Sequence, residues 1–97
     1  MSTLHVLSHS PFGDDRLTSC LRVIGANDAL LLTGDAVYAL QTGTAPCNAL
    51  NARHPTLFVL AEDAQARALT IPGHARAIDY PAFVELSLHY DKVNSWL

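Results

Sequence analysis

Short apolar segments alternate with polar ones along this chain of 97 residues. The apolar segments are Leu4–Leu7, Ala29–Leu32, Thr56–Leu60 and Ala75–Ile78. The first three are almost continuous rather than alternating, which is typical of strands buried on both faces of a parallel sheet. The fourth is the weakest of them, so we expect it to lie at an edge of the sheet.

Helices are predicted between these strands, each beginning near an acidic residue or a proline. The expected helices run from Asp14 or Asp15 to Ile24 with Gly25 ending the first, from Asp35 to Leu40, from Glu62 and Asp63 to Leu69, and from Pro81 to Tyr90. Between them, Thr42–Pro46 predicts a loop, and Asn48–Arg53 a helical turn that stops at His54-Pro55. The tail Asp91–Leu97 is expected to be too short to form an element of its own.

Alternation of strands and helices predicts an α/β fold with right-handed crossovers. We expect one domain over residues 1–97, because this length leaves room for no second core. Its predicted architecture is a small open parallel sheet of about four strands, flanked by helices on both faces.

Composition adds an expectation about partners. Hydrophobic residues make up 49% of the chain but charged residues only 15%, against a typical share of about 25%. Too few charges remain to cover the surface, which favours a subunit that hides part of it in a partner. The net charge is -3, and no basic stripe indicates direct binding of nucleic acid.

The two cysteines are too few for a disulfide scaffold, and no apolar segment has the ~20 residues that a membrane helix needs. The N-terminus lacks the pattern of a signal peptide. We therefore expect a cytoplasmic protein with reduced thiols and no membrane association.

Small or polar residues follow the strands, where the carboxyl ends of a parallel sheet form a ligand-binding rim. They are Ser8-His9-Ser10, Thr33-Gly34-Asp35, Ala61-Glu62-Asp63 and Asp79-Tyr80. The alternative for Asp35, Glu62 and Asp63 is that they cap helices. A serine hydrolase using the Ser8–Ser10 rim is the other option, although no third orienting group is in view.

Cys20 is the candidate for catalytic chemistry. It lies on the flank of an apolar stripe formed by Leu17, Leu21 and Ile24, so a buried, inert thiol is one interpretation. The other is a reactive thiolate whose pKa Arg16 lowers.

Other candidate groups carry weaker signals. Cys47 has no recognisable supporting group and is interpreted as structural or incidental. The five histidines form no ligand cluster, and no glycine-rich phosphate loop is present, so we expect neither a metal nor a cofactor. Trp96 either folds back on the sheet or docks with Leu97 at a subunit interface.

Segments along nearly the whole chain resemble the DsrH/TusB family of the DsrE-like superfamily. They are Leu4–Phe12, Leu30–Leu32 with Gly34–Ala39, Leu57–Leu60 with Glu62-Asp63 and Ala66–Leu69, Ile78–Val84, and Val93–Trp96.

This resemblance implies a subunit of a sulfur relay, assembled as a heterohexamer with two DsrE-like partners of the TusC/TusD or DsrE/DsrF type. Such complexes exchange persulfide sulfur with sulfur-carrier proteins. The sulfur serves either 2-thiolation of the tRNA wobble uridine or dissimilatory sulfur oxidation. Ser19-Cys20-Leu21 matches the position of a cysteine on the first helix of DsrH-like proteins, which many TusB-like proteins lack. The resemblance thus leaves open a persulfide on Cys20 or a purely scaffolding subunit.

Overall fold

A five-stranded parallel sheet forms the centre of the computed structural model, which describes residues 1–96. In chain order the elements are β1 (Thr3–Leu7), α1 (Arg16–Val23), β2 (Ala29–Leu32), the 3₁₀ helix η1 (Gly34–Leu40), α2 (Ala45–Arg53), β3 (Thr56–Leu60), α3 (Ala61–Ala66), β4 (Ala75–Ile78), α4 (Tyr80–His89) and β5 (Lys92–Trp96). The strand order is β4-β3-β2-β1-β5, so both edge strands come from the second half of the chain. The four predicted strands and the α/β class are confirmed, including the place of β4 at an edge.

The fifth strand corrects the expectation that the tail forms no element. β5 pairs with β1 in parallel, from Thr3 opposite Lys92 to Leu7 opposite Trp96. Four of its five side chains are exposed, so this segment lacks the apolar run by which buried strands are recognised. Backbone pairing with β1, rather than burial of side chains, makes it a strand.

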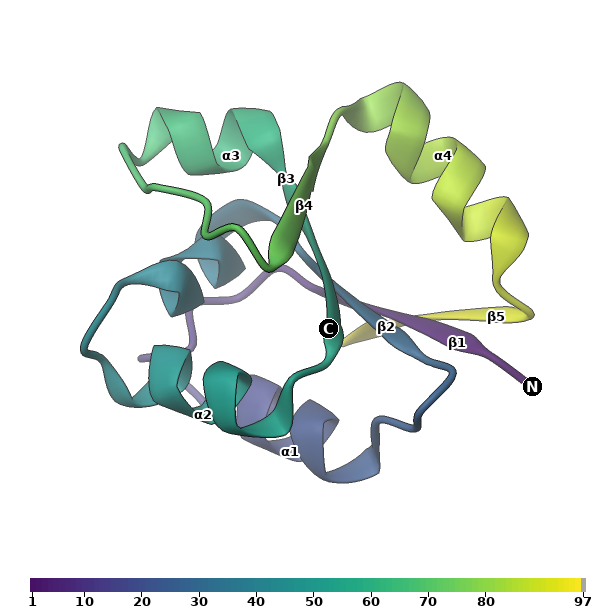
Figure 1. The fold of residues 1–97 in the computed structure, drawn as a ribbon, viewed down its shortest axis with the longest axis horizontal. Coiled ribbons are helices and arrows are strands. Elements are labelled where there is room, and N and C mark those ends of the chain that lie inside the picture. Colours follow the sequence, from purple (N-terminus) through teal and green to yellow (C-terminus); the bar gives the residue numbers. More distant parts are fainter. Residues whose placement is uncertain (97) are drawn as a thin grey trace.

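Two apolar cores lie on the two faces of the sheet. The larger contains alternate strand residues such as Leu7, Leu30 and Val59 together with side chains from α1, η1, α2 and α3. The smaller contains the intervening strand residues such as Leu4 and Leu31 and is covered by α4. Figure 1 shows α4 alone on its side of the sheet, across from the other helices. This asymmetry leaves one face thinly covered.

Helix boundaries differ from the prediction for local reasons. α2 begins at Ala45 rather than Asn48, because the Thr44 hydroxyl accepts the N–H of Cys47 (3.4 Å) and caps the first turn. α3 ends at Ala66 rather than Leu69, and Ala68 has a φ of 54° that a continuing helix does not allow. α1 ends at Val23, one residue before the predicted Ile24.

Candidate functional site

The rim at the carboxyl ends of β1, β2 and β3 is held together by its own polar groups. Thr33 donates its N–H and its hydroxyl to the carbonyl of Leu7, at 2.9 and 3.0 Å. The next N–H, from Gly34, donates to a carboxylate oxygen of Asp63 at 2.7 Å. Gly34 has a φ of 50°, and a Cβ there would lie 3.1 Å from the carbonyl oxygen of Ser8. The rim is therefore closely packed around a glycine that other residues do not replace without strain.

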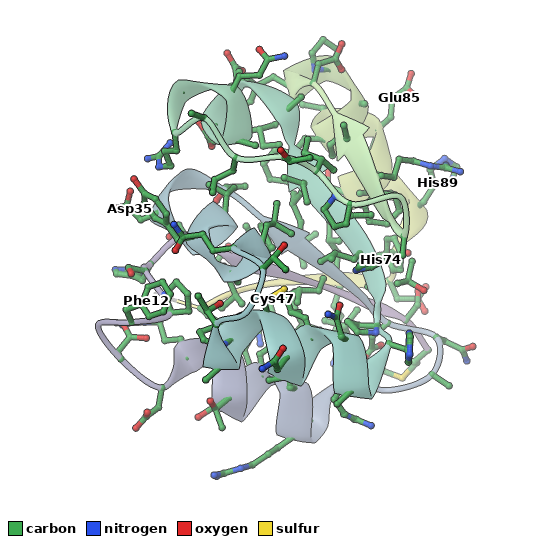
Figure 2. All side chains as sticks on the ribbon, turned by 60° about the vertical axis from the view of Figure 1, so that its left-hand side comes forward. Phe12, Asp35, Cys47, His74, Glu85 and His89 are labelled. Carbon is green, nitrogen blue, oxygen red and sulfur yellow. The ribbon has the colours of Figure 1, made fainter. Side chains whose placement is uncertain are left out.

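Asp35 and Asp63 of this rim make structural contacts, but not as the predicted caps of their own helices. Thr33 and Leu60 occupy the N-cap positions of η1 and α3. Asp35 instead accepts two hydrogen bonds from the guanidinium of Arg67, at 2.9 and 3.1 Å. The same guanidinium donates to the carbonyl of Asp63 at 3.0 Å. Asp35 lies at the surface (Figure 2), and these contacts bind α3 to η1.

The Ser8–Ser10 rim lacks the geometry of a nucleophile with its base. The Ser8 hydroxyl lies 3.5 Å from Nδ1 of His9, which is the outer limit of a hydrogen bond. The Ser10 hydroxyl accepts the N–H of Phe12 at 3.3 Å. Within residues 1–96, no hydrogen bond joins His9 to a carboxylate that would orient its ring.

Cys20 is fully buried, with 0% of its surface exposed. It belongs to the larger core together with Leu17 and Leu21. Burial raises the pKa of the Cys20 thiol to about 12, and the nearby charge of Asp28 acts in the same direction. In this conformation the thiol is neutral and out of reach of a persulfide donor, which favours the packing interpretation. A persulfide on Cys20 stays a prediction.

Cys47 is the more accessible of the two thiols. It is half-buried in the first turn of α2, and Figure 2 marks its position. Its sulfur lies 3.9 Å from the carbonyl oxygen of Leu40 and 3.9 Å from the side-chain nitrogen of Asn51. Neither contact comes from a positively charged group that would favour the thiolate, and a structural or incidental role for Cys47 stays a prediction.

A polar cluster at the opposite end of the sheet was not predicted. Trp96 donates its indole N–H to Nδ1 of His5 at 3.1 Å, and Nε2 of His5 lies 3.3 Å from the carboxylate of Asp28. Because an indole nitrogen can only donate, this contact assigns Nδ1 of His5 as the acceptor, which leaves Nε2–H to donate to Asp28. Asp28 also accepts the N–H groups of Thr3 (2.9 Å) and Gly25 (2.8 Å).

The position of Trp96 in this cluster bears on the two alternatives predicted for it, and the hydrogen bonds of the cluster lower the pKa of Asp28. Trp96 packs against the larger core, as the fold-back alternative predicted, whereas Leu97 lies outside the described residues. The N–H of Gly25 is the main cause that lowers the pKa of Asp28, with Thr3 and His5 contributing, while partial burial opposes them. Apart from the position of His5 in a buried strand, no spacing in the sequence points to this cluster.

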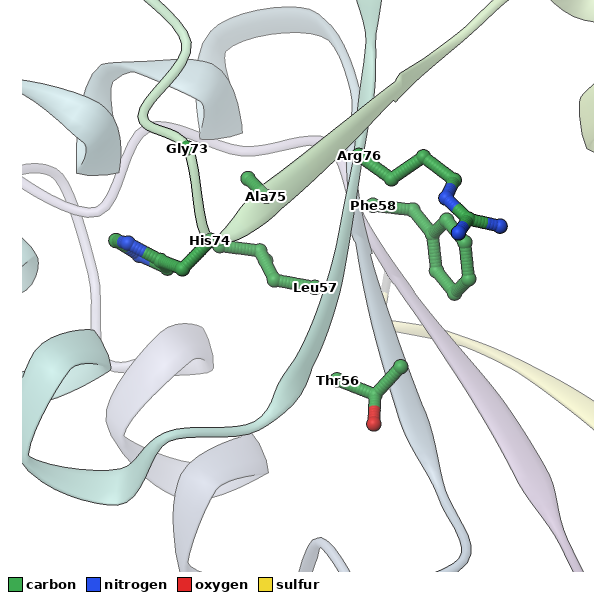
Figure 3. A pocket seen from close by; sticks show the side chains of 7 residues that line it. All are labelled: Thr56, Leu57, Phe58, Gly73, His74, Ala75 and Arg76. Atoms are coloured by element: carbon green, nitrogen blue, oxygen red, sulfur yellow. The ribbon is translucent and has the colours of Figure 1, made fainter.

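A surface cleft of about 570 Å³ lies at the β4 edge and contains none of the predicted site residues. It is lined by Thr56–Phe58 of β3 and by Gly73–Arg76. Figure 3 shows His74 and Arg76 pointing to opposite sides of β4, with Arg76 beside Phe58. His74 and Arg76 therefore do not converge on a common ligand position.

Residues 1–96 contain no group of three or more His, Cys, Asp or Glu side chains placed to hold a metal ion. None of their helices is long and apolar enough to cross a membrane.

Comparisons with known proteins give a consistent family. The model of the family described as "DsrH like protein" matches residues 9–93. The chain is 38% identical over 95 residues to Protein TusB of Erwinia tasmaniensis, covering 96% of this chain and 99% of that protein. It is 36% identical over 95 residues to Protein TusB of Yersinia enterocolitica, with the same coverage. The crystal structure of the ychN protein from E. coli superimposes with a TM-score of 0.75 at 18% identity, covering 99% of this chain and 100% of that one. The last likeness shows the fold.

Proposed function

This chain belongs to the DsrH-like protein family, and from that membership we propose that it is a subunit of a sulfur-relay complex. The observation that carries the proposal is the match to the family model over residues 9–93, together with TusB relatives aligned over almost their full length. The proposed complex is a cytoplasmic heterohexamer with two DsrE-like partner subunits. It passes persulfide sulfur between carrier proteins, towards 2-thiolation of the tRNA wobble uridine or a related route of sulfur oxidation.

An exposed apolar stripe on α4 supports a role inside a complex. Tyr80, Val84 and Leu88 follow one another at four-residue spacing and are 54%, 61% and 81% exposed. The opposite side of the helix, with Phe83 and Leu86, packs on the smaller core. No residue of α4 is fully buried. A helix that is apolar on both sides is usually covered on both sides, so we assign the α4 stripe to contact with a partner subunit.

The burial of Cys20 supports a mainly structural contribution by this subunit. Sulfur moves between proteins when a thiolate attacks the outer sulfur of a persulfide. One S–S bond forms while the donor's S–S bond breaks, and the donor cysteine leaves as a thiolate. The attacking group must be deprotonated and accessible. Cys20, with a pKa raised to about 12 and no exposed surface, meets neither condition unless α1 moves. The reactive thiol of the relay then belongs to a partner.

Co-expression with the two DsrE-like partners tests membership of the complex. We expect the three chains to copurify as one assembly, and Leu88→Glu to abolish copurification because it places a charge in the α4 stripe. Gln41→Glu, which adds the same charge at an exposed position outside α4, serves as the control. A wild-type chain that copurifies with neither partner would overturn the proposal.

Intact-mass analysis of the assembled complex tests the role of Cys20. After treatment with a polysulfide donor, a carrier role predicts an added sulfur atom on this chain that disappears in Cys20→Ser and persists in Cys47→Ser. The scaffold role predicts no addition at Cys20 even within the complex. We expect the second result, because the thiol lies in the core.

A further inference from the structure

α1 and α2 lie side by side on the face of the sheet across from α4 and run in the same direction. Two adjoining hollows between them, of about 520 and 470 Å³, share Thr18 of α1 and Ala49 of α2. One hollow reaches Arg22 and Arg53 at the carboxyl ends of the two helices. The other reaches Asp15 and the start of α2 at their amino ends. Together they form one continuous groove.

The charges of this groove are separated by sign. Asp15 lies at the amino end and Arg22 at the carboxyl end, and both side chains are exposed. Seven residues of helix place them about 10 Å apart. Within residues 1–96 neither side chain takes part in an ion pair, whereas the neighbouring Asp14 is paired with Arg16. Asp15 and Arg22 are therefore available to groups outside the chain.

The middle of the groove is formed by small side chains. Thr18 lies between Asp15 and Arg22 on the exposed side of α1, and Ala49 and Ala52 face it from α2. Small residues let the backbones of two packed helices approach closely. The groove thus has small side chains at its centre, between an acidic and a basic end.

We propose that this surface, which we call the α1–α2 face (Asp15, Thr18, Arg22, Ala49 and Ala52), binds a second copy of the chain about a two-fold axis. The axis passes near Thr18 and Ala49, so that α1 and α2 lie antiparallel to the same helices of the other copy. Asp15 of each copy then meets Arg22 of the other, and the two helix pairs oppose their dipoles. A two-fold interface needs a patch that complements itself, and the opposite charges at the two ends meet that requirement.

The α1–α2 face is smaller than a standard interface. Helices of eight and nine residues are about 12–14 Å long, and packed neighbours lie about 10 Å apart. The resulting contact falls short of the ~800 Å² per partner typical of stable complexes. We therefore expect a weak dimer of the isolated chain, with a dissociation constant in the micromolar range or above. This proposal goes beyond the relay function, since it needs no other subunit and leaves the α4 stripe free.

Sedimentation equilibrium of the isolated chain tests the proposal through charge exchange. Asp15→Arg and Arg22→Asp each convert two attractive pairs into repulsive ones, so we expect each variant alone to raise the dissociation constant about tenfold or more. An equimolar mixture of the two variants, and the double variant Asp15→Arg with Arg22→Asp, should each restore self-association. Raising the salt concentration should weaken the wild-type dimer, because the paired charges are at the surface.

Glu85→Arg is the matched control, since it reverses a charge on α4 at the opposite side of the molecule. Figure 2 shows Glu85 on the far side from Phe12, a residue that lines the groove. Thermal unfolding of each variant checks that it folds. The proposal is overturned by a wild-type chain that stays monomeric up to about 1 mM, by failure of the mixture to associate, or by a dimer that Glu85→Arg dissociates. None of these results bears on copurification with the relay partners, so the two proposals fail independently.

Discussion

Replacing Asp28 with alanine removes the group on which three donors converge. Its carboxylate accepts the N–H of Thr3 at the start of β1 and the N–H of Gly25 in the turn after α1. It also accepts Nε2–H of His5, whose other ring nitrogen accepts the indole N–H of Trp96. The substitution therefore loosens the amino end of the sheet, where β1, β2 and the last strand meet.

The size of the effect follows from these contacts. A hydrogen bond to a charged group contributes about 1.5–3 kcal/mol. The Asp28 side chain is 15% exposed, so water partly replaces the lost acceptor for the two backbone donors. We expect the free energy of unfolding to fall by about 2–4 kcal/mol, well below the sum of three separate bonds. Against a total of about 5–15 kcal/mol for a typical domain, this is a large loss.

Urea unfolding at neutral pH, followed by circular dichroism and by the fluorescence of Trp96, measures this loss. Asp91→Ala is the control, because its exposed carboxylate accepts a single N–H, from Ser2, and its removal should cost about 0.5 kcal/mol or less. A deficit for Asp28→Ala no larger than that of the control would refute the reasoning.

Acid adds a second test with a definite sign. The pKa of Asp28 is lowered in the folded chain, chiefly by the N–H of Gly25, so the carboxylate contributes stability above its ordinary pKa of about 3.9. That contribution is lost as the pH falls through the lower folded pKa. Between about pH 5 and pH 2, the wild type should therefore lose more stability than Asp28→Ala. Parallel pH profiles for the two proteins would contradict the assignment.

Three further predictions concern the rim, the thiols and the last strand. Gly34→Ala should lower the free energy of unfolding by about 1–3 kcal/mol, because φ is 50° there and the new Cβ would lie 3.1 Å from the Ser8 carbonyl; an unchanged melting temperature would count against this. A maleimide at pH 8 should label Cys47 well before Cys20, since a pKa of about 12 leaves roughly one Cys20 thiol in 10,000 ionised, and equal native labelling rates would show that Cys20 is accessible. Trp96→Phe keeps an aromatic ring but loses the bond to Nδ1 of His5, which should cost about 1 kcal/mol in urea unfolding; wild-type stability would mean that the bond contributes nothing.

The sheet could be predicted largely from the sequence because its strands are buried. Leu30 and Leu32 face one core while Ala29 and Leu31 face the other, so an unbroken apolar run marks β2 without ambiguity. β5 offers no such signal, since four of its five side chains are exposed and the strand forms by pairing with the distant β1. β5 forms because its backbone pairs with that of β1, and no local sequence pattern indicates this pairing.

The candidate sites were predicted less completely. The apolar stripe of α1 placed Cys20 at its flank, but whether a flank residue is covered depends on how far the helix tilts onto the sheet. Asp28 carried no signal, because two of its three donors, Thr3 and His5, lie in β1, a distant segment that only folding brings to it. Asp63 was recognised as polar at the rim, yet its acceptor role requires the turn at Gly34. Such contacts join segments that are distant in the sequence, whereas hydrophobic periodicity indicates only local structure, so it could not predict them.

The pairing of the first strand with the last has a consequence for biosynthesis. β1 leaves the ribosome long before its partner β5, which begins at Lys92, opposite Thr3. Until that segment has been made, β1 has one strand edge unpaired, and unpaired edges are prone to join other chains. His5 meanwhile lacks the indole partner that it has in the folded chain. Truncation shortly before β5 should therefore yield a nascent chain that depends on chaperones, because β1 keeps an unpaired edge.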